Sequence, residues 1–367
     1  MQEVQVQQPY WDWQAREGLP DHTGLSIQDL NDLELKPWAR MGGSGAFIDL
    51  GMRRPRNGGG WVAEIPGGQS LNPMRHMFDE GIYITKGRGA TTIWIEGKPK
   101  QMVEWQEGSL VAIPLNAWHQ HFNTGPEPAR FYSMNNMGSI LNTYNSEAFV
   151  FDNPFVFEDR YAGQDDFYSG DGDLLGVPQE QYKVWRTNFV PDARNLQLHS
   201  WQARGAGGLN VMLEMADTMC PHISQFPVGT YKKAHVHNRG TGGAGGGGAP
   251  LLILGGEGFT LVWQPGTKDI QKLDWKANGL VVAPSSYFHQ HFNAGGNPAR
   301  YLAAIGIGQR RNRTGEKNPN DVSEGEGGTQ IEYPNEYPEV HRIFEDELKK
   351  RGVECRMAGM SPHCTCG

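Results

Sequence analysis

The sequence predicts an all-β-dominated fold of two barrels in one chain, with a mixed connector between them and a helix near the C-terminus. Three observations lead to this prediction. The chain has 367 residues, which is longer than one hydrophobic core usually spans. It carries 49 glycines, 23 prolines and 11 tryptophans, a composition typical of short strands joined by tight turns around aromatic cores. Finally, a block of residues in the first half recurs in the second half.

The repeated block keeps its spacing in both copies. Pro114 corresponds to Pro284, an offset of 170 positions, and the same offset relates Arg130 to Arg300 at the other end of the block. Each half is therefore expected to be one copy of the same structural unit. The matching residues between these ends are His119, Gln120, His121, Phe122, Asn123, Pro128 and Ala129 in the first half, and His289, Gln290, His291, Phe292, Asn293, Pro298 and Ala299 in the second.

Each unit contains segments that favour β-strands. Residues 91–95 and 259–263 are short β-branched and aromatic runs bounded by glycine. Residues 109–114 and 280–284 are apolar runs that end at proline, as strands often do. This spacing of short strands predicts an antiparallel sandwich or barrel in each half.

The repeat also sets the expected domain organisation. We expect the connector to contribute helices that pack across both barrels, and residues 339–351 to form a helix because apolar and charged positions alternate there at helical spacing. The expected parts are an N-terminal arm (1–45), a first barrel (46–145), the connector (146–200), a second barrel (201–310) and a C-terminal extension (311–367).

The composition argues against nucleic-acid and membrane partners. The formal net charge is −8 and no stretch concentrates lysine and arginine, so a phosphate backbone would be repelled. No segment is long and apolar enough to cross a bilayer, and residues 1–13 lack the basic start and apolar run of a secretory signal. Four cysteines are too few for a disulfide framework in so long a chain. We therefore expect a soluble protein in the reducing cytoplasm.

Histidines gather in two patterns that occur in both halves. In the first half the patterns read Gly68, Met74, His76, Glu80 and Gly87, then Gly108, Pro114, Asn116, His119 and Asn123. In the second half they read Gly229, His235 and His237, then Pro284, His289 and Asn293. This arrangement resembles the two motifs of the cupin family over about two thirds of the chain. The resemblance implies jelly-roll barrels, also called double-stranded β-helices, and a metal bound by histidines.

The second half offers a three-histidine metal site. His235 and His237 are two residues apart, so on a strand they face the same side and can reach one ion. His289, on a neighbouring strand, would complete the set. The glutamate of the family motif is absent, because Ala249 stands where Glu80 stands in the first half.

The first half offers His76, Glu80 and His119, two histidines and one carboxylate. Such a triad with open positions is typical of non-haem Fe(II). Met74 replaces the first histidine of the motif and is expected to pack beside the site, since methionine is a poor ligand for hard divalent ions. A barrel that has lost its metal and is kept for packing is the alternative.

Further residues could take part in the chemistry. His121 and His291 each follow a presumed ligand by two positions and should face the barrel interior, as catalytic groups or as buried structural histidines. Arg130 and Arg300 could hold a substrate carboxylate, but their presence in both halves favours a structural salt bridge.

Two segments have no counterpart in the other half. The glycine-rich run 240–248 predicts a loop, either a lid over the substrate or a tolerated surface insertion. In the tail, Cys355, Cys364 and Cys366 with His363 could bind a soft metal or act in thiol chemistry, although terminal tails are usually disordered. Cys220 is expected in the core.

The resemblance implies several functions. The main interpretation is a non-haem Fe(II) dioxygenase of a small oxygenated acid or diol, similar to gentisate and 1-hydroxy-2-naphthoate dioxygenases, which also have a three-histidine iron site in one barrel. One alternative is a redox-neutral lyase, decarboxylase or isomerase that uses Mn(II), Zn(II) or Ni(II) as a Lewis acid. The other is a ligand-binding cupin without turnover. Two-barrel cupins commonly associate, so a homo-oligomer is expected.

Overall fold

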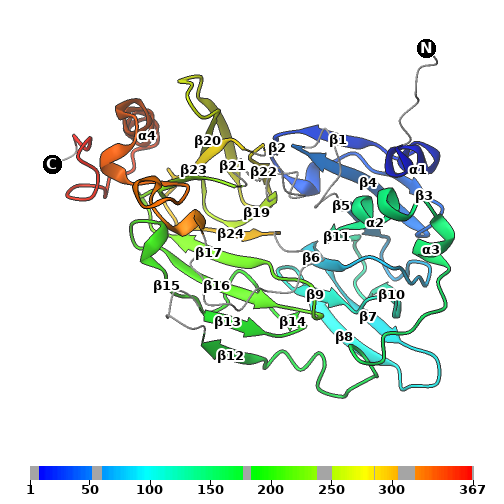
Figure 1. The fold of residues 1–367 in the computed structure, drawn as a ribbon. Helices are drawn as coiled ribbons and strands as arrows, with labels where there is room; N and C mark the ends of the chain where they lie inside the picture. The colour runs from blue at the N-terminus through cyan, green and yellow to red at the C-terminus, as the bar shows by residue number, and fades with distance from the viewer. Residues whose placement is uncertain are drawn as a thin grey trace, which may run out of the picture.

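Two β-barrels lie next to each other in the structure, a computed structural model that describes residues 8–51, 60–176, 183–237, 250–284, 286–304 and 319–365. Figure 1 shows helices α1, α2 and α3 gathered on the outer side of one barrel, and α4 with the C-terminus on the far side of the other. The all-β-dominated, two-barrel prediction is confirmed. The helices are α1 (Pro9–Glu17), α2 (Met137–Tyr144), α3 (Glu147–Phe151) and α4 (Pro338–Arg351).

Barrel 1 consists of a large and a small antiparallel sheet. The large sheet has the order β1-β4-β5-β11-β6-β9-β14, with β3 beside β4, and the small sheet has the order β10-β7-β8. Only the contact of β1 with β4 is parallel among these pairs. The strands are β1 (Asp21–Gly24), β3 (Lys36–Trp38), β4 (Gly43–Leu50), β5 (Gly60–Ile65), β6 (Glu80–Lys86), β7 (Arg88–Trp94), β8 (Gln101–Gln106), β9 (Leu110–Ile113), β10 (Trp118–Asn123), β11 (Ala129–Asn135) and β14 (Phe189–Val190).

Barrel 2 repeats this plan. Its large sheet has the order β12-β13-β16-β17-β24-β19-β22-β2, with β15 beside β16, and its small sheet has the order β21-β20-β23-β18-β25. The strands are β2 (Ser26–Ile27), β12 (Asp173–Gly176), β13 (Lys183–Arg186), β15 (His199–Ser200), β16 (Leu209–Glu214), β17 (His222–Phe226), β18 (Ala234–Val236), β19 (Pro250–Gly255), β20 (Glu257–Trp263), β21 (Gln271–Lys276), β22 (Leu280–Val282), β23 (Phe288–Asn293), β24 (Ala299–Ala303) and β25 (Gln330–Ile331).

The strands that carry the repeated block occupy matching places. β10 pairs with β7 so that His119 faces Ile93, and β23 pairs with β20 so that His289 faces Val262. Each repeated asparagine, Asn123 and Asn293, closes the loop that follows its strand. The side chain of Asn293 donates to the carbonyl oxygen of Asn297 and accepts from the amide of Gly295. The predicted internal duplication is therefore confirmed.

Each barrel receives one strand from the segment that precedes the other. β2, from the N-terminal arm, pairs with β22 of barrel 2, and β14, from the connector, pairs with β9 of barrel 1. The exchange provides hydrogen-bond partners for two edge strands that would otherwise be open. The connector was expected to supply helices across both barrels. In the described residues 146–176 and 183–200 it supplies short strands, and α3 is the one α-helix among them.

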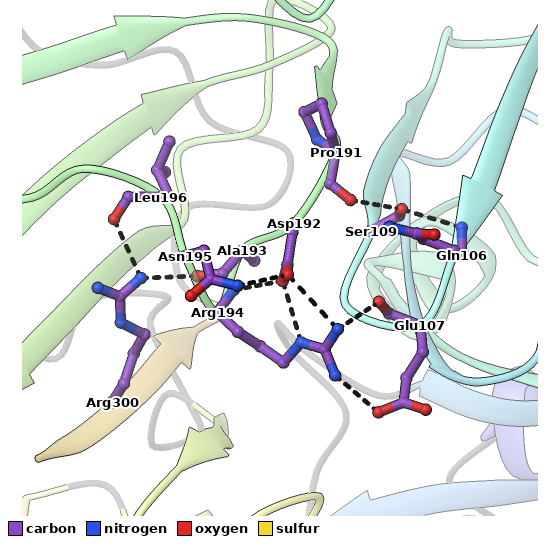
Figure 2. A network of polar contacts seen from close by, with 10 residues as sticks. All are labelled: Gln106, Glu107, Ser109, Pro191, Asp192, Ala193, Arg194, Asn195, Leu196 and Arg300. Carbon is purple, nitrogen blue, oxygen red and sulfur yellow. Dashed lines mark hydrogen bonds and ion pairs between the residues drawn. The ribbon is translucent and has the colours of Figure 1, made fainter.

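The repeated arginines hold these crossing segments. Arg130 donates through Nη1 to the carbonyl oxygens of Leu30 and Asn31, at 2.9 and 2.7 Å. Arg300 donates in the same way to two carbonyl oxygens of the connector, those of Ala193 and Leu196, at 3.1 and 3.0 Å, as Figure 2 shows. The two arginines are therefore anchors for the polypeptide chain, since their guanidinium groups are already engaged by backbone oxygens.

The salt bridge expected at these positions forms in one half. Arg130 pairs with Glu64 at 2.7 Å, whereas Arg300 donates to the neutral amide of Gln225 at 2.9 Å. On the connector itself, Arg194 pairs with Glu107 of barrel 1 at 2.7 Å, so an ion pair also links this segment to the other barrel (Figure 2).

The large sheets are buried on both faces, because the two barrels pack against each other through them. Alternate residues of β19 show this. Leu251 and Ile253 point into a core inside barrel 2, while Leu252 and Leu254 belong to the core shared with barrel 1. This two-sided burial explains why β9 and β22 are continuous apolar runs in the sequence.

Tight turns position the strands around each barrel. Gly87 and Gly256 link β6 to β7 and β19 to β20 with φ of 86° and 78°, and a Cβ on Gly256 would lie 2.7 Å from the carbonyl oxygen of Pro298. Asn116, where the family motif has glycine, also has a positive φ of 55°. Asparagine tolerates this left-handed conformation better than most residues, so the replacement keeps the turn.

The C-terminal extension lies on barrel 2. The helix predicted for residues 339–351 is confirmed as α4, and Val340, Phe344 and Leu348 pack with Tyr231 and Phe292 in one buried cluster. None of the described helices is long and apolar enough to span a membrane. The glycine-rich run 240–248, Ala249 and Cys366 lie outside the described residues, so the predictions made for them stay predictions.

Candidate metal centres

Adjacent strands bring the three predicted histidines of barrel 2 together. His235 on β18 lies directly opposite His289 on β23, and His237 follows the end of β18. The ring centroids of His235 and His289 are 4.1 Å apart, and Nε2 of His235 lies 3.2 Å from Nε2 of His237. Metal–nitrogen bonds of about 2.1 Å at right angles place neighbouring ligand atoms roughly 3.0 Å apart. The cluster therefore has the dimensions of a metal site.

A hydrogen bond orients the ring of His289 toward the other two histidines. Its Nδ1 donates to the carbonyl oxygen of Tyr287 at 3.3 Å, which leaves the lone pair of Nε2 for the cluster. In the part of the chain that the structure describes, the buried Nδ1 of His235 has no hydrogen-bond partner. The ligand atoms of His235, His237 and His289 all lie within 4.8 Å of one another.

Barrel 1 brings His76, Glu80 and His119 together in the corresponding place. All three side chains are almost completely buried. Nε2 of His76 lies 3.0 Å, and Nε2 of His119 3.8 Å, from the same carboxylate oxygen of Glu80. The other oxygen of that carboxylate accepts a hydrogen bond from Ser133. Met74 packs against the apolar core of the barrel, as predicted.

The donor and acceptor atoms of this cluster fit a bound cation. Nδ1 of His76 donates to the carbonyl oxygen of Phe78 at 2.9 Å. Its Nε2 faces a carboxylate oxygen of Glu80, and a bound cation would take the place of a proton on this nitrogen. Nδ1 of His119 likewise donates to the carbonyl oxygen of Ala117 at 3.2 Å, and its buried Nε2 has no hydrogen-bond partner among the described residues. A divalent ion bound by these three groups would satisfy all of them, so the residues fit a metal.

Burial lowers the pKa of His119 and of the three histidines of barrel 2. It lowers the pKa of His289 to about 4, and burial with the neighbouring His76 and His121 lowers the pKa of His119 to about 3. Burial would raise the pKa of Glu80, but the hydrogen bond and charge of His76, with smaller contributions from His119 and Ser133, lower it to about 2. Neutral imidazoles and an ionised carboxylate are the protonation states that bind metal.

The two predicted catalytic histidines lie beside the clusters but are engaged in a repeated hydrogen-bond chain. In barrel 1 the hydroxyl of Thr91 lies 2.7 Å from Nδ1 of His121 and accepts from the indole N–H of Trp105 at 2.9 Å. His291, Thr260 and Trp275 repeat the arrangement in barrel 2, at 2.9 and 3.0 Å. The repetition favours a positioning role for both histidines, and a catalytic role stays a prediction.

Two buried cations near the barrel 2 cluster were not predicted from the sequence. Arg204 is 7% and Lys232 is 5% exposed, and the charge of Arg204 contributes to lowering the pKa of His235, where burial has the larger effect. Arg204 pairs with Asp321 at 2.5 Å, and the ammonium group of Lys232 donates to the hydroxyl of Tyr301 at 2.9 Å. The sequence gives no reason to expect Lys232 in particular to be buried, because two successive lysines normally indicate a surface position.

Comparison with known proteins agrees with this architecture. The cupin-domain family model matches residues 61–135, which cover β5 to β11 of barrel 1. A deletion mutant of the oxalate decarboxylase of Bacillus subtilis superposes with a TM-score of 0.50 over 79% of this chain and 80% of that one, at 15% identity. The fold is that of a bicupin. A point mutant of the same enzyme superposes over the same shares of both chains with a TM-score of 0.51 at 14% identity.

A third structure of that enzyme was studied for its Mn(II) centres, and it matches the bicupin with a TM-score of 0.50 at 13% identity, over 79% of this chain and 80% of that one. The search of curated protein sequences gave no match. At these identities the likeness establishes the fold, and the chemistry has to be argued from the residues of this chain. Its two clusters stand in corresponding places of the two barrels and differ in charge, because only barrel 1 supplies a carboxylate.

Proposed function

We propose that the bicupin is a metal-dependent enzyme that acts on a small carboxylic acid in a redox-neutral reaction of the decarboxylase or lyase type. The observation that carries this proposal is the pair of buried cations beside the three neutral histidines of barrel 2. Arg204 and Lys232 face only one carboxylate, Asp321, among the charged groups recorded around them in the described residues. A divalent metal held by the histidines would add two more positive charges.

Such an interior attracts an anion. Uncompensated buried charge is costly, so a negatively charged substrate gains binding energy by entering. Lys232 is held by the hydroxyl of Tyr301, and burial lowers the pKa of its ammonium group. A carboxylate within reach of Lys232 would accept a charge-assisted hydrogen bond in place of this neutral contact. When bound, the metal would act as a Lewis acid that polarises the carboxylate.

The likeness of the fold to oxalate decarboxylase supports the choice of reaction. That enzyme acts on a small dicarboxylic acid and contains Mn(II) centres, as its name and the study of those centres state. We therefore propose Mn(II), rather than the Fe(II) favoured by the sequence, as the metal of both barrels. Glu80 serves as a ligand in this proposal and not as a general base, because a pKa of about 2 makes it a weak acceptor of protons near neutral pH.

The dioxygenase predicted from the sequence is the second candidate. One observation favours it: His76, Glu80 and His119 form the two-histidine, one-carboxylate set that is typical of non-haem Fe(II). The two candidates differ in their use of oxygen, because a ring-cleaving dioxygenase consumes one O2 per turnover and a decarboxylase has no net oxygen demand.

The test is turnover of oxalate and related small carboxylic acids by the Mn(II)-loaded and Fe(II)-loaded protein, with CO2 release and oxygen uptake measured together. We expect CO2 release without stoichiometric oxygen uptake. Lys232→Met should raise KM for the acid by about tenfold or more, since a charged hydrogen bond contributes about 1.5–3 kcal/mol. Lys233→Met is the matched control, because Lys233 pairs with Glu332 instead. Stoichiometric oxygen uptake, or equal effects of the two variants, would contradict the proposal.

A further inference from the structure

The C-terminal tail folds back on α4 and places two cysteines against a histidine and a glutamate of that helix. The group consists of His341, Glu345, Cys355 and Cys364, whose ligand atoms all lie within 4.8 Å of one another. It lies at the outer side of barrel 2, where α4 packs, and contains none of the ligands of the two barrel clusters. The sequence suggested a soft-metal site for the tail cysteines but did not include either helical residue.

The tail is ordered by contacts with the barrel and with α4. The amide of Arg356 donates to the carbonyl oxygen of Gly229 at 2.8 Å, and Met357 is fully buried. At its end, the amide and the hydroxyl of Thr365 donate to the two carboxylate oxygens of Glu345, at 2.7 and 2.5 Å. These bonds fix the course of the chain between the two cysteines.

The helix contributes two ligands on one face. His341 and Glu345 are four residues apart, which aligns their side chains along α4, and they are 1% and 5% exposed. Tyr231 donates its hydroxyl proton to Glu336, so its oxygen accepts from Nδ1 of His341 at 2.8 Å. Nε2 of His341 then carries a lone pair, and it lies 3.1 Å from an oxygen of Glu345. A cation between Nε2 and this oxygen would satisfy both atoms.

The sulfur atoms have the spacing of a shared metal. Sγ of Cys355 lies 3.7 Å from Sγ of Cys364, whereas a disulfide would need about 2.05 Å. Two zinc–sulfur bonds of about 2.3 Å at the tetrahedral angle place the sulfurs roughly 3.8 Å apart. Nitrogen and oxygen ligands at about 2.0–2.1 Å lie roughly 3.3 Å apart in the same geometry, close to the observed 3.1 Å.

We propose that His341, Glu345, Cys355 and Cys364 form a structural Zn(II) site that fastens the C-terminal tail to α4. Zn(II) is chosen because thiolate and imidazole ligands in a tetrahedral set suit it better than Mn(II) or Mg(II). Four protein ligands leave no open position, so the site stabilises the fold and does not carry out chemistry. Tyr231 orients His341 and connects the site to the segment that leads into the barrel 2 cluster.

The test uses the full chain, purified under a reductant, stripped of metal and titrated with Co(II). Cobalt bound by thiolates gives a near-ultraviolet charge-transfer band, which the histidine and carboxylate clusters of the barrels cannot give. We expect the charge-transfer band to reach the amplitude of one thiolate-bound cobalt per chain once all sites are filled, and to disappear when Zn(II) is added in excess. Absence of the charge-transfer band, or its persistence in excess Zn(II), would overturn the proposal.

Variants locate the site. Cys355→Ser and Cys364→Ser should each abolish or strongly weaken the charge-transfer band, while Cys220→Ser and His237→Ala should leave it intact. Tyr231→Phe should keep the band but weaken Zn(II) binding about 10- to 100-fold, as loss of an orienting hydrogen bond does at other metal sites. An unchanged manganese content of the barrels checks that the cysteine and tyrosine variants are folded, and one remaining manganese per chain is the corresponding check for His237→Ala. A disulfide between Cys355 and Cys364 that persists under reductant, or an unchanged band in both serine variants, would refute the assignment. The wild-type titration can refute it even if a variant does not fold.

Discussion

Acidification should destabilise the metal-free bicupin steeply, because both barrels bury neutral histidines. Burial is the largest cause that lowers the pKa of His119 to about 3, and that of His121 and His289 to about 4. An exposed histidine of the unfolded chain has a pKa of 6.5. Between these values the unfolded chain binds more protons than the folded protein, so stability falls as the pH falls.

The size of the effect follows from these values. Each pH unit between the two pKa values is worth about 1.4 kcal/mol for each histidine. From pH 6.5 to pH 5 the loss is therefore about 2 kcal/mol for each of the three histidines, or about 6 kcal/mol together. This sum is comparable with the whole stability of a typical domain, about 5–15 kcal/mol. Metal-free protein should thus be close to unfolding at pH 5, whereas stability should be nearly constant above pH 7.

Urea unfolding at pH 7 and pH 5 measures this loss. His121→Gln should lose about 2 kcal/mol less than the wild type on acidification, since one of the three histidines is gone. His199→Gln, on β15 outside the barrel interiors, is the control for removing a histidine as such. Equal wild-type stability at both pH values, or a full pH dependence of stability in His121→Gln, would contradict this prediction.

Three further predictions concern the scaffold and use urea unfolding as the measurement. Gly256→Ala should cost at least about 1 kcal/mol more than Gly266→Ala, because both glycines have φ near 80° but only the first would bring a Cβ against Pro298; equal costs would contradict this. Arg300→Met should cost about 2 kcal/mol by leaving two connector carbonyl oxygens without their charged donor, and a loss below about 0.5 kcal/mol would show that the anchor is dispensable. Thr260→Val should cost about 2–4 kcal/mol, since it leaves an indole N–H and an imidazole nitrogen without their shared hydroxyl; a neutral result would remove the proposed positioning role of that hydrogen-bond chain.

The barrels could be predicted from the sequence because the duplication left a direct trace. A constant offset between two histidine-containing blocks identifies two copies of one unit without any knowledge of their contacts. His235 and His237 could be assigned to one face of a strand by their spacing alone, and the structure brings both to His289. The pairing of β18 with β23 was expected from the resemblance to the cupin fold and not from the spacing of the histidines.

The crossing of the two arms could not be predicted, because β2 and β14 are only two residues long. A two-residue strand has no periodicity, and its position depends on which edge of the large sheets is open. Arg130 and Arg300 are the residues through which the exchange is fixed. Their repetition was visible in the sequence, but the backbone carbonyl oxygens that they bind were not.

The buried cations and the tail site escaped prediction for another reason. Lys232 and Lys233 are identical in type and adjacent, and only tertiary packing buries one beneath Tyr301. His341 and Glu345 belong to a helix rich in charged residues, and the sequence does not indicate that the tail packs over them. Both sites combine residues that are far apart in the chain, so no local pattern records them.

The central claim is that each barrel holds one metal ion through the imidazoles that converge inside it. The most direct measurement is the metal content, by elemental analysis, of the wild type loaded with Mn(II) and of His119→Ala and His237→Ala, after passage over a desalting column. We expect two manganese ions per wild-type chain and a loss of about one in each variant. Unchanged manganese content in both variants, or none in the wild type, would contradict it.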